Sequence, residues 1–354
     1  MNKFFADENH VRVLGRSLFR DNIRYLSWSC SGVEFLFTGS KLTADIWTDW
    51  VLDEPWKEVF KCYAAVFIDN EEVPRKRFAI ESGTNNYTIY ESDAPSTVKI
   101  KILKLSEAAF SKMGIVSISA DGEIVPAKPL SRRFEFIGDS ITCGFGIEAK
   151  CTEEGFRTET ENSYITYGAE VAKAFNADFN LISWSTIGVY SSDCKEDNGK
   201  PNDEWIMPML YDYTDIGIEG TLNISEHIEW DFKSFVPDVI FVNLGTNDMS
   251  FTKGISERVQ AFKEAYKKFI LHIRKKNPTS EIFCVLGMMG RDLCSAVEEA
   301  VSDIEDKKVH ALGLDEQLEA DGIGSGNHPN FVTHKKAAEK IIAEIKRTGV
   351  IYEN

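Results

Sequence analysis

Hydrophobic and polar positions alternate with a period of two through the first part of the chain, which is the pattern of half-buried strands. The alternation is clearest at 33–37, 42–46 and 98–102, and Val59–Ile68 predicts a further strand. Ala120-Asp121-Gly122 predicts a hairpin turn. Because no long amphipathic helix interrupts these strands, the pattern predicts an antiparallel β-sandwich of the jelly-roll kind.

The pattern changes after Pro126 and Pro129, where strands begin to alternate with helices. The predicted elements are a strand at 134–137, a helix capped by Asn162 and ending near Phe175, a strand that includes Leu181 and Ile182, a buried strand at 238–244, a helix at 256–276, a strand at 281–286 and a helix at 333–347. Such an alternation indicates βαβ units in a three-layer α/β domain. We therefore expect two domains, a β-sandwich at 1–128 and an α/β domain at 129–354.

The charge narrows the possible partners. Lys and Arg total 40 against 56 Asp and Glu, which gives a net charge of −16. Such a chain repels phosphate backbones and anionic lipid, so we expect a neutral substrate and neither nucleic acid nor a membrane as a partner. The first ten residues turn acidic where a signal peptide needs an apolar core, and none of the seven Cys forms a Cys-x-x-Cys motif. We therefore expect a cytoplasmic protein with reduced thiols.

Three motifs could carry chemistry. Gly138-Asp139-Ser140 follows a predicted strand, where a glycine permits a sharp turn and presents the serine at the strand end. A simple helix cap is an equally common role for Asp or Ser at such a place. Asn247 and Asp248 follow the buried strand at 238–244, where the Asn amide could donate to an oxyanion, or where the pair could form only an Asx turn. His328, in a loop before Pro329, suits general-base work, although a lone loop histidine is more often a surface residue.

Taken together and in this order, the three motifs resemble the SGNH (GDSL-like) hydrolase superfamily over residues 131–348. The resemblance implies a flavodoxin-like α/β/α sandwich. It implies Ser140 as the nucleophile and His328 as the general base, with no cofactor and no metal. The oxyanion hole would then use the Ser140 N–H, the Asn247 side chain and the N–H of Gly188, or of Thr186 in its place.

One departure from the superfamily pattern is informative. Ser325 stands where most members carry an Asp three residues before the histidine. A strand-rich N-terminal domain joined to such a site resembles carbohydrate esterase family 2, whose members remove acetyl groups from xylan and mannan. We therefore expect a Ser-His dyad in which a main-chain carbonyl of the 325–327 loop orients His328. Asp321 is the alternative.

Other functions remain open at this point. Gly144–Ala149 fits a dinucleotide fingerprint but lies too far beyond its strand, no Gly-x-Ser-x-Gly elbow is present, and no two His have a His-x-x-x-His spacing. A lysophospholipase or thioesterase would need an acyl channel, and a non-catalytic carbohydrate-binding protein would leave the motifs unused. Aromatic residues are dense between the first two motifs, and we expect some to line a sugar cleft although most aromatics are core. They are Trp184, Tyr190, Trp205, Tyr211, Tyr213 and Trp230, of which Trp184, Tyr190 and Trp205 are the candidates.

Overall fold

The computed structural model describes residues 1–351, which divide into two compact units. The first unit contains residues 1–130 together with two later segments, 157–163 and 213–229. The rest of the described chain forms the second unit. The predicted division into 1–128 and 129–354 stays a proposal. The sequence pattern gave no sign that the segments 157–163 and 213–229 belong to the strand-rich unit.

The first unit is built on one antiparallel sheet of ten strands with the order β3-β4-β9-β5-β8-β6-β7, while β1 pairs with β9 and both β2 and β10 pair with β5. Its strands are β1 Asn2–Phe4, β2 Arg12–Leu14, β3 Leu18–Arg20, β4 Ile23–Leu26, β5 Gly32–Thr48, β6 Cys62–Ile68, β7 Lys76–Ile80, β8 Gly83–Lys104, β9 Met113–Ala120 and β10 Glu123–Pro126. Three short helices belong to this unit or adjoin it, η1 Pro55–Phe60, η2 Thr158–Thr160 and α4 Ile216–Thr221. The sheet is curled, and a jelly-roll arrangement of its strands stays a prediction.

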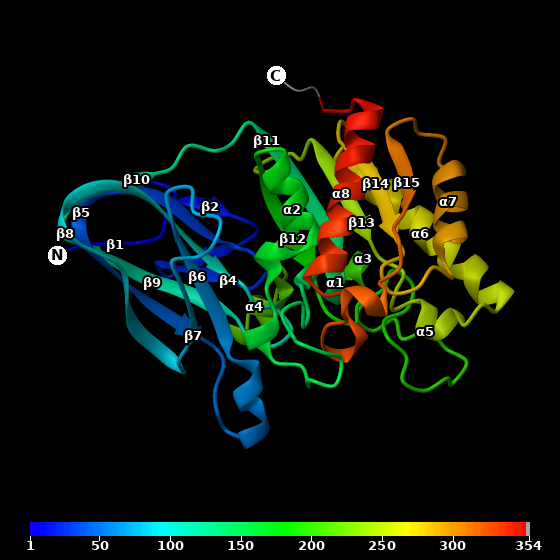
Figure 1. Ribbon diagram of the computed structural model, residues 1–354, viewed down its shortest axis with the longest axis horizontal. Coiled ribbons are helices and arrows are strands. Elements are labelled where there is room, and N and C mark those ends of the chain that lie inside the picture. Colours follow the sequence, from blue (N-terminus) through cyan, green and yellow to red (C-terminus); the bar gives the residue numbers. More distant parts are fainter. Residues whose placement is uncertain (352–354) are drawn as a thin grey trace. The chain divides into compact units, whose positions relative to one another are not determined.

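The long strands β5 and β8 carry the alternation that the sequence displays, and Figure 1 shows β8 and β9 beside β5. Val33, Phe35 and Phe37 are fully buried, whereas Leu36 and Thr38 on either side of Phe37 are exposed. The runs at 33–37 and 42–46, which look like two strands in the sequence, belong to the single strand β5. Irregular register near Gly39 and Lys41 lets this one strand continue through both runs.

Two local predictions in this unit were wrong. The strand expected from Val59 begins only at Cys62, because residues 55–60 form the η1 turn after a proline at the helix start. Ala120-Asp121-Gly122 is not a hairpin, because β9 and β10 both pair with β5 instead of with each other. Asp121 bridges the irregularity between them, and its carboxylate accepts the N–H groups of Ser40 at 2.9 Å and Lys41 at 3.0 Å.

The second unit is a five-stranded parallel sheet with the order β12-β11-β13-β14-β15, which is the 2-1-3-4-5 order of flavodoxin-like folds. Its strands are β11 Arg132–Gly138, β12 Ala177–Ser183, β13 Val239–Asn243, β14 Glu281–Leu286 and β15 Val309–Gly313. Its helices are α1 Ser140–Cys143, α2 Tyr167–Ala174, α3 Met207–Leu210, α5 Met249–Thr252, α6 Ser256–Lys276, α7 Cys294–Ser302 and α8 Phe331–Thr348, with the short turns η4 Glu319–Asp321 and η5 Ser325–Asn327. The short turn η3 Ser163–Ile165 begins at the last residue of the first unit's segment 157–163. Helix α2 packs on α8 and β12, while α6 packs on α7, which covers β14 and β15 (Figure 1).

The predicted α/β elements are confirmed, with one wrong boundary. Helix α6 has the predicted bounds, and β13 is buried at every position. The helix expected from Asn162 begins instead at Tyr167 with Thr166 as its N-cap, because a 3-10 turn occupies residues 163–165. No disulfide joins the seven cysteines, and no described helix has both the length and the hydropathy of a membrane span.

We predict that Asp121→Ala lowers the melting temperature of the protein, since it removes the acceptor for two backbone N–H groups at the β9–β10 irregularity. Asp93→Ala, at an exposed position of β8, is the matched control and leaves the melting temperature near the wild-type value. Equal melting temperatures for the two variants, measured by circular dichroism, would show that Asp121 contributes nothing at this point.

Candidate active site

A tight turn at the end of β11 places Ser140. A Cβ on Gly138 would lie 2.0 Å from Thr142 Oγ1, so only glycine fits at this position. Asp139 is the N-cap of α1, and its carboxylate accepts the Ile141 N–H at 3.0 Å. The capping role therefore belongs to Asp139, and Ser140, 5% exposed, stands at the carboxyl end of the strand as the motif predicts.

His328 lies against this serine. Its Nε2 is 2.8 Å from Ser140 Oγ, and its Nδ1 is 3.1 Å and 3.2 Å from the main-chain oxygens of Gly326 and Ser325. This is the predicted dyad geometry, with carbonyl oxygens where a triad would have a carboxylate. Asp321, the alternative, is engaged elsewhere, because its carboxylate pairs with Lys336 at 2.6 Å.

The histidine loop is held by the segment that follows α1. A Cβ on Gly146 would lie 2.5 Å from Ser325 Cβ, so the two backbones meet closely. The Ser325 hydroxyl donates to the Glu154 carbonyl at 2.7 Å, and Thr152 Oγ1 accepts the Asn327 N–H at 2.9 Å. Ser325 therefore anchors the loop by its side chain, while its carbonyl faces the imidazole.

Burial controls the charge of His328. Desolvation lowers the pKa of the imidazole from 6.5 to about 4, and the hydrogen bonds to Gly326 and Ser325 oppose this only in part. A neutral imidazole with Nδ1 donating to carbonyls leaves Nε2 free to accept the Ser140 hydroxyl proton. The local environment thus favours the protonation state that a general base requires.

The expected oxyanion donors have partners in this structure. The Asn247 amide donates to the Ile187 carbonyl at 2.9 Å and, over a longer 3.3 Å, to Asp139 Oδ2. The Gly188 N–H donates to Ser192 Oγ at 3.3 Å, again a long hydrogen bond. Thr186, the alternative, is exposed and has a φ of 66°. The assignment of these donors stays a prediction.

Asp248 organises the loop that carries Gly188, a role that sequence reasoning missed. Its buried carboxylate accepts the N–H groups of Tyr190 and Ser191 at 2.8 Å and of Val189 at 3.1 Å. A Cβ on Gly188 would lie 2.7 Å from this carboxylate and 2.0 Å from the Ser191 carbonyl. Burial raises the pKa of Asp248 to about 6 against the lowering by these bonds. The signal in the sequence was its position directly after Asn247.

The aromatic residues between the motifs separate into two groups. Trp184 and Trp205 are half-buried and meet edge to face with centroids 5.4 Å apart, and Tyr190 is half-buried beside Phe251. Tyr211 is fully buried, and its hydroxyl donates to Glu135 at 2.9 Å, so it belongs to the core. Tyr213 lies in the first unit. A sugar-binding role for Trp184, Tyr190 and Trp205 stays a prediction.

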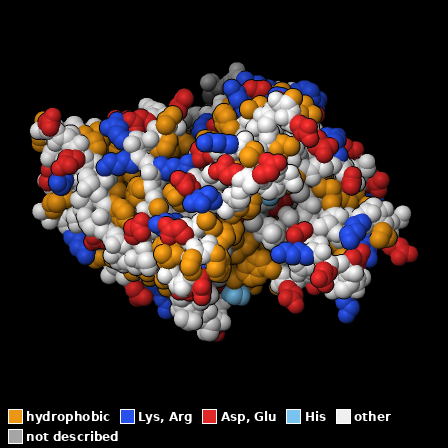
Figure 2. Space-filling model, turned by 60° about the horizontal axis from the view of Figure 1, so that its bottom comes forward, with side chains coloured by type: hydrophobic (Ala, Val, Ile, Leu, Met, Phe, Trp, Pro, Cys, Tyr) orange, Lys and Arg blue, Asp and Glu red, His pale blue; other side chains and the backbone are white. Residues whose placement is uncertain are grey.

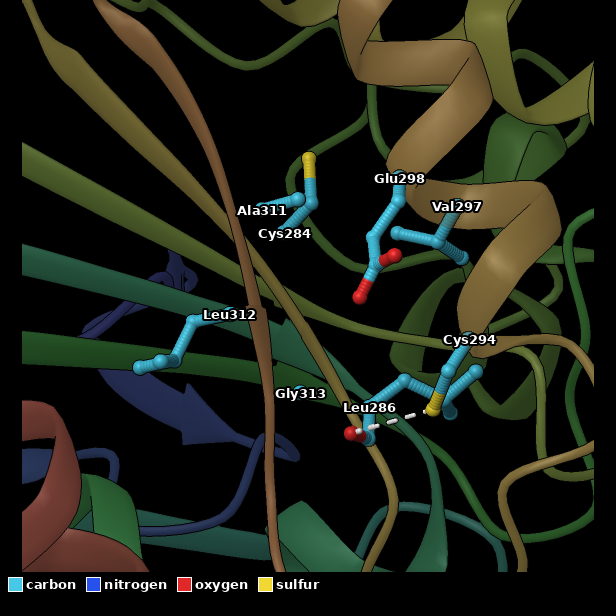
Figure 3. A pocket seen from close by; sticks show the side chains of 8 residues that line it. All are labelled: Cys284, Leu286, Cys294, Val297, Glu298, Ala311, Leu312 and Gly313. Carbon is cyan, nitrogen blue, oxygen red and sulfur yellow. Dashed lines mark hydrogen bonds between the residues drawn. The ribbon is translucent and has the colours of Figure 1, made fainter.

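Two depressions in the second unit lie apart from these residues. The gap in Figure 3, where Cys294 Sγ approaches the Leu286 carbonyl at 3.6 Å between α7 and β14, has no room for a water molecule. A groove of about 290 Å³ between α6 and α7 is lined by charged side chains such as Lys263 and Glu299. Neither contains Ser140, His328 or Asn247, so neither is the candidate site.

Each of the other five histidines has a polar partner of its own. His10, His227, His272 and His310 each contact a carboxylate at 2.7–2.8 Å, on Asp7, Glu219, Asp212 and Glu281 respectively. His334 is buried, and its Nδ1 accepts the Tyr167 N–H at 3.0 Å. These contacts explain the five histidines by local structure, which leaves His328 as the one placed against a serine hydroxyl.

Comparison with known families covers most of the chain. The model of the GDSL-like lipase/acylhydrolase family matches residues 136–330, and the carbohydrate esterase 2 N-terminal model matches residues 13–129. The first match contains Ser140, Asn247 and His328. The second ends where the parallel sheet is about to begin.

Individual relatives agree with this. The cellulase/esterase CelE of Acetivibrio thermocellus is 33% identical over 353 residues, which cover 96% of this chain but only 40% of that protein. An acetylxylan esterase/glucomannan deacetylase of Cellvibrio japonicus is 24% identical over 97% of this chain and 90% of its own length. The solved structure of a family two carbohydrate esterase from Clostridium thermocellum, in complex with cellohexaose, has a TM-score of 0.82 at 31% identity, covering 96% of this chain and 100% of that one.

The family match and the esterase relatives define the class of protein, a carboxylic-ester hydrolase. The chain belongs to the GDSL-like lipase/acylhydrolase family and, with its N-terminal domain, to carbohydrate esterase family 2. The resemblance seen in the sequence is thereby confirmed.

We predict that activity persists well below the pH at which a solvated histidine would be protonated. Because burial lowers the pKa of His328 to about 4, the acid limb of kcat/KM falls near that value and not near 6.5. The stability of the fold also decreases as the pH falls. The unfolded state binds the proton first, so this group's contribution is complete above pH 6.5 and is lost as pH falls toward 4. A pH profile with an acid limb near 6.5 would contradict the buried, neutral imidazole.

Proposed function

We propose that this chain is a carbohydrate O-acetyl esterase that removes acetyl groups from plant-derived xylan or mannan oligosaccharides through a Ser140-His328 dyad. The observation that carries the proposal is the 2.8 Å contact between His328 Nε2 and Ser140 Oγ at the carboxyl end of β11. The names of the relatives, an esterase and an acetylxylan esterase/glucomannan deacetylase, support the ester and the substrate class.

The proposed reaction has two halves. Ser140 Oγ attacks the acetyl carbonyl carbon while its proton moves to His328 Nε2, and the carbonyl oxygen becomes an oxyanion. Collapse of this intermediate breaks the bond to the sugar oxygen, which takes the proton from His328. Water then attacks the acetyl-serine and gives one proton to His328, which passes it to Ser140 Oγ as the bond to the acetyl carbon breaks. Acetic acid leaves and ionises to acetate in solution.

Donors around the oxyanion complete the proposal. The first donor is the N–H of Ser140, which lies in the first turn of α1. The second is the Asn247 side-chain amide, whose longer hydrogen bond to Asp139 leaves it able to turn toward the oxyanion. Gly188 or Thr186 supplies the third N–H. A preorganised donor of this kind stabilises the transition state by about 3 kcal/mol. The long bonds of Asn247 and Gly188 are the ones that an oxyanion replaces at least cost.

The surface suits a neutral polymer. Figure 2 shows Lys and Arg side chains scattered among Asp and Glu side chains over the face it presents, and the net charge is −16. A hydroxyl-rich, uncharged ligand avoids the repulsion that an anionic one would meet. Trp184, Tyr190 and Trp205 are half-buried, and aromatic side chains with exposed surface can serve as apolar platforms for a sugar ring.

We predict that Ser140→Ala lowers kcat for acetyl-ester hydrolysis by at least about 10³-fold because the nucleophile is lost. The variant keeps the wild-type circular dichroism spectrum and no longer reacts with a fluorophosphonate probe. Ser295→Ala, at an exposed position of α7, is the control that keeps both activity and labelling. Wild-type turnover by Ser140→Ala would refute the dyad, and a wild type that neither reacts nor turns over would favour a non-catalytic carbohydrate-binding protein.

We predict that turnover of 4-nitrophenyl esters falls as the acyl chain lengthens from acetate to dodecanoate, since no long apolar channel is expected beside a sugar-binding site. Acetylated xylan and acetylated mannan are deacetylated, with release of acetate as the measurement. Faster turnover of octanoate and longer esters than of acetate would instead favour the lysophospholipase or thioesterase function.

A further inference from the structure

Phe145 lies between His328 and a second aromatic ring. Its ring centroid is 4.2 Å from that of the imidazole at an interplanar angle of 31°, and 3.7 Å from that of Phe156 at 12°. The Phe145 ring therefore stacks on Phe156 on one side and lies tilted against the imidazole of His328 on the other. All three residues belong to the second unit. Each keeps part of its surface exposed, although the groups packed around the His328 imidazole desolvate it enough to lower its pKa.

The backbone of Phe145 is tied to the nucleophile. Helix α1 ends at Cys143, and its C-cap Gly144 adopts a left-handed conformation with a φ of 81°. The next N–H, that of Phe145, donates to the Ser140 carbonyl at 3.1 Å. A single turn therefore connects Ser140 with Phe145, and His328 contacts both residues.

The imidazole needs such support because its hydrogen bonds fix it incompletely. Nδ1 is shared between two carbonyl oxygens at 3.1 Å and 3.2 Å, and neither matches the strength of a bond to a carboxylate. The torsion that sets the plane of a histidine ring is intrinsically broad. A flat ring against one face removes this freedom, since rotation of the imidazole would push it into Phe145.

The aromatic face also acts on charge. When His328 takes the serine proton it becomes a cation, and a cation is attracted to the face of an aromatic ring. The two carbonyl oxygens favour the imidazolium less than a carboxylate does. Phe145 thus acts when the proton moves from Ser140 to His328, which is the step that a carboxylate would otherwise assist.

We propose that Phe145, backed by Phe156, is a positioning residue for His328 that fixes the imidazole plane and favours the imidazolium in place of the carboxylate of a full triad. This inference rests on the proposed function of the dyad. It differs from simple core packing, because a packing role needs only apolar volume, whereas this role needs a flat aromatic face.

The test compares Phe145→Leu with Phe145→Tyr, using 4-nitrophenyl acetate as the substrate. Leucine keeps apolar volume but has no flat face, so we expect kcat to fall about tenfold with KM unchanged. Tyrosine keeps the face, so Phe145→Tyr retains kcat near the wild-type value. Phe156→Leu, which only loosens the support, lowers kcat by a smaller factor in the same direction.

Each outcome bears on one idea. If Ser140→Ala abolishes hydrolysis but Phe145→Leu keeps the wild-type kcat, the positioning role is wrong and the dyad stands. A rise in KM with kcat unchanged would also overturn it, because it would make Phe145 a substrate contact. If Ser140→Ala has no effect, the proposed function itself fails. If Phe145→Leu does not fold by circular dichroism, Phe156→Leu decides, and wild-type kcat in that variant overturns the proposal.

Discussion

The candidate site depends on the turn at Gly138, which has no room for a side chain. At Gly138 a Cβ would collide with Thr142, so the chain passes from β11 into α1 within a single residue and presents Ser140 at the strand end. Asp139, buried in the same turn, serves two purposes. One carboxylate oxygen caps α1, and the other faces the Asn247 amide at 3.3 Å. One residue thereby positions both Ser140, the proposed nucleophile, and Asn247, the expected oxyanion donor.

The same dependence extends to the second motif. Asp248 follows Asn247 and collects three consecutive N–H groups from the loop 189–191. Gly188 has no room for a Cβ against that carboxylate, so the loop closes tightly over it. Two adjacent residues thus act on different parts of the site, Asn247 toward Asp139 and Asp248 toward the Gly188 loop. A buried carboxylate with three donors is stable only if each bond is made, which makes this loop stiff.

Sequence reasoning succeeded where one strong signal decided the outcome. The amphipathic helix 256–276 and the buried strand β13 could be predicted because their periodicity has no local competitor. It failed where local signals competed, as when Val59 continued a strand pattern that Pro55 had already turned into a 3-10 helix. Asp121-Gly122 has the composition of a hairpin, yet β5 offered both flanking strands a better partner. Ser140 and His328 could be found by motif, whereas the contacts of Asp248 and Phe145 depend on chain segments far apart in sequence.

The lack of a carboxylate at position 325 changes the balance of the site. A carboxylate beside a histidine holds its pKa up and strengthens it as a base. Here burial lowers the pKa of His328 to about 4, so the imidazole stays neutral over a wider pH range, but in the proposed dyad it would accept the serine proton less readily. The energy that a carboxylate would supply must then come from elsewhere. The 2.8 Å approach of Nε2 to Ser140 leaves little reorganisation to be done, and the Phe145 face favours the cation that forms. A dyad of this kind therefore depends more on the placement of its imidazole than a triad does.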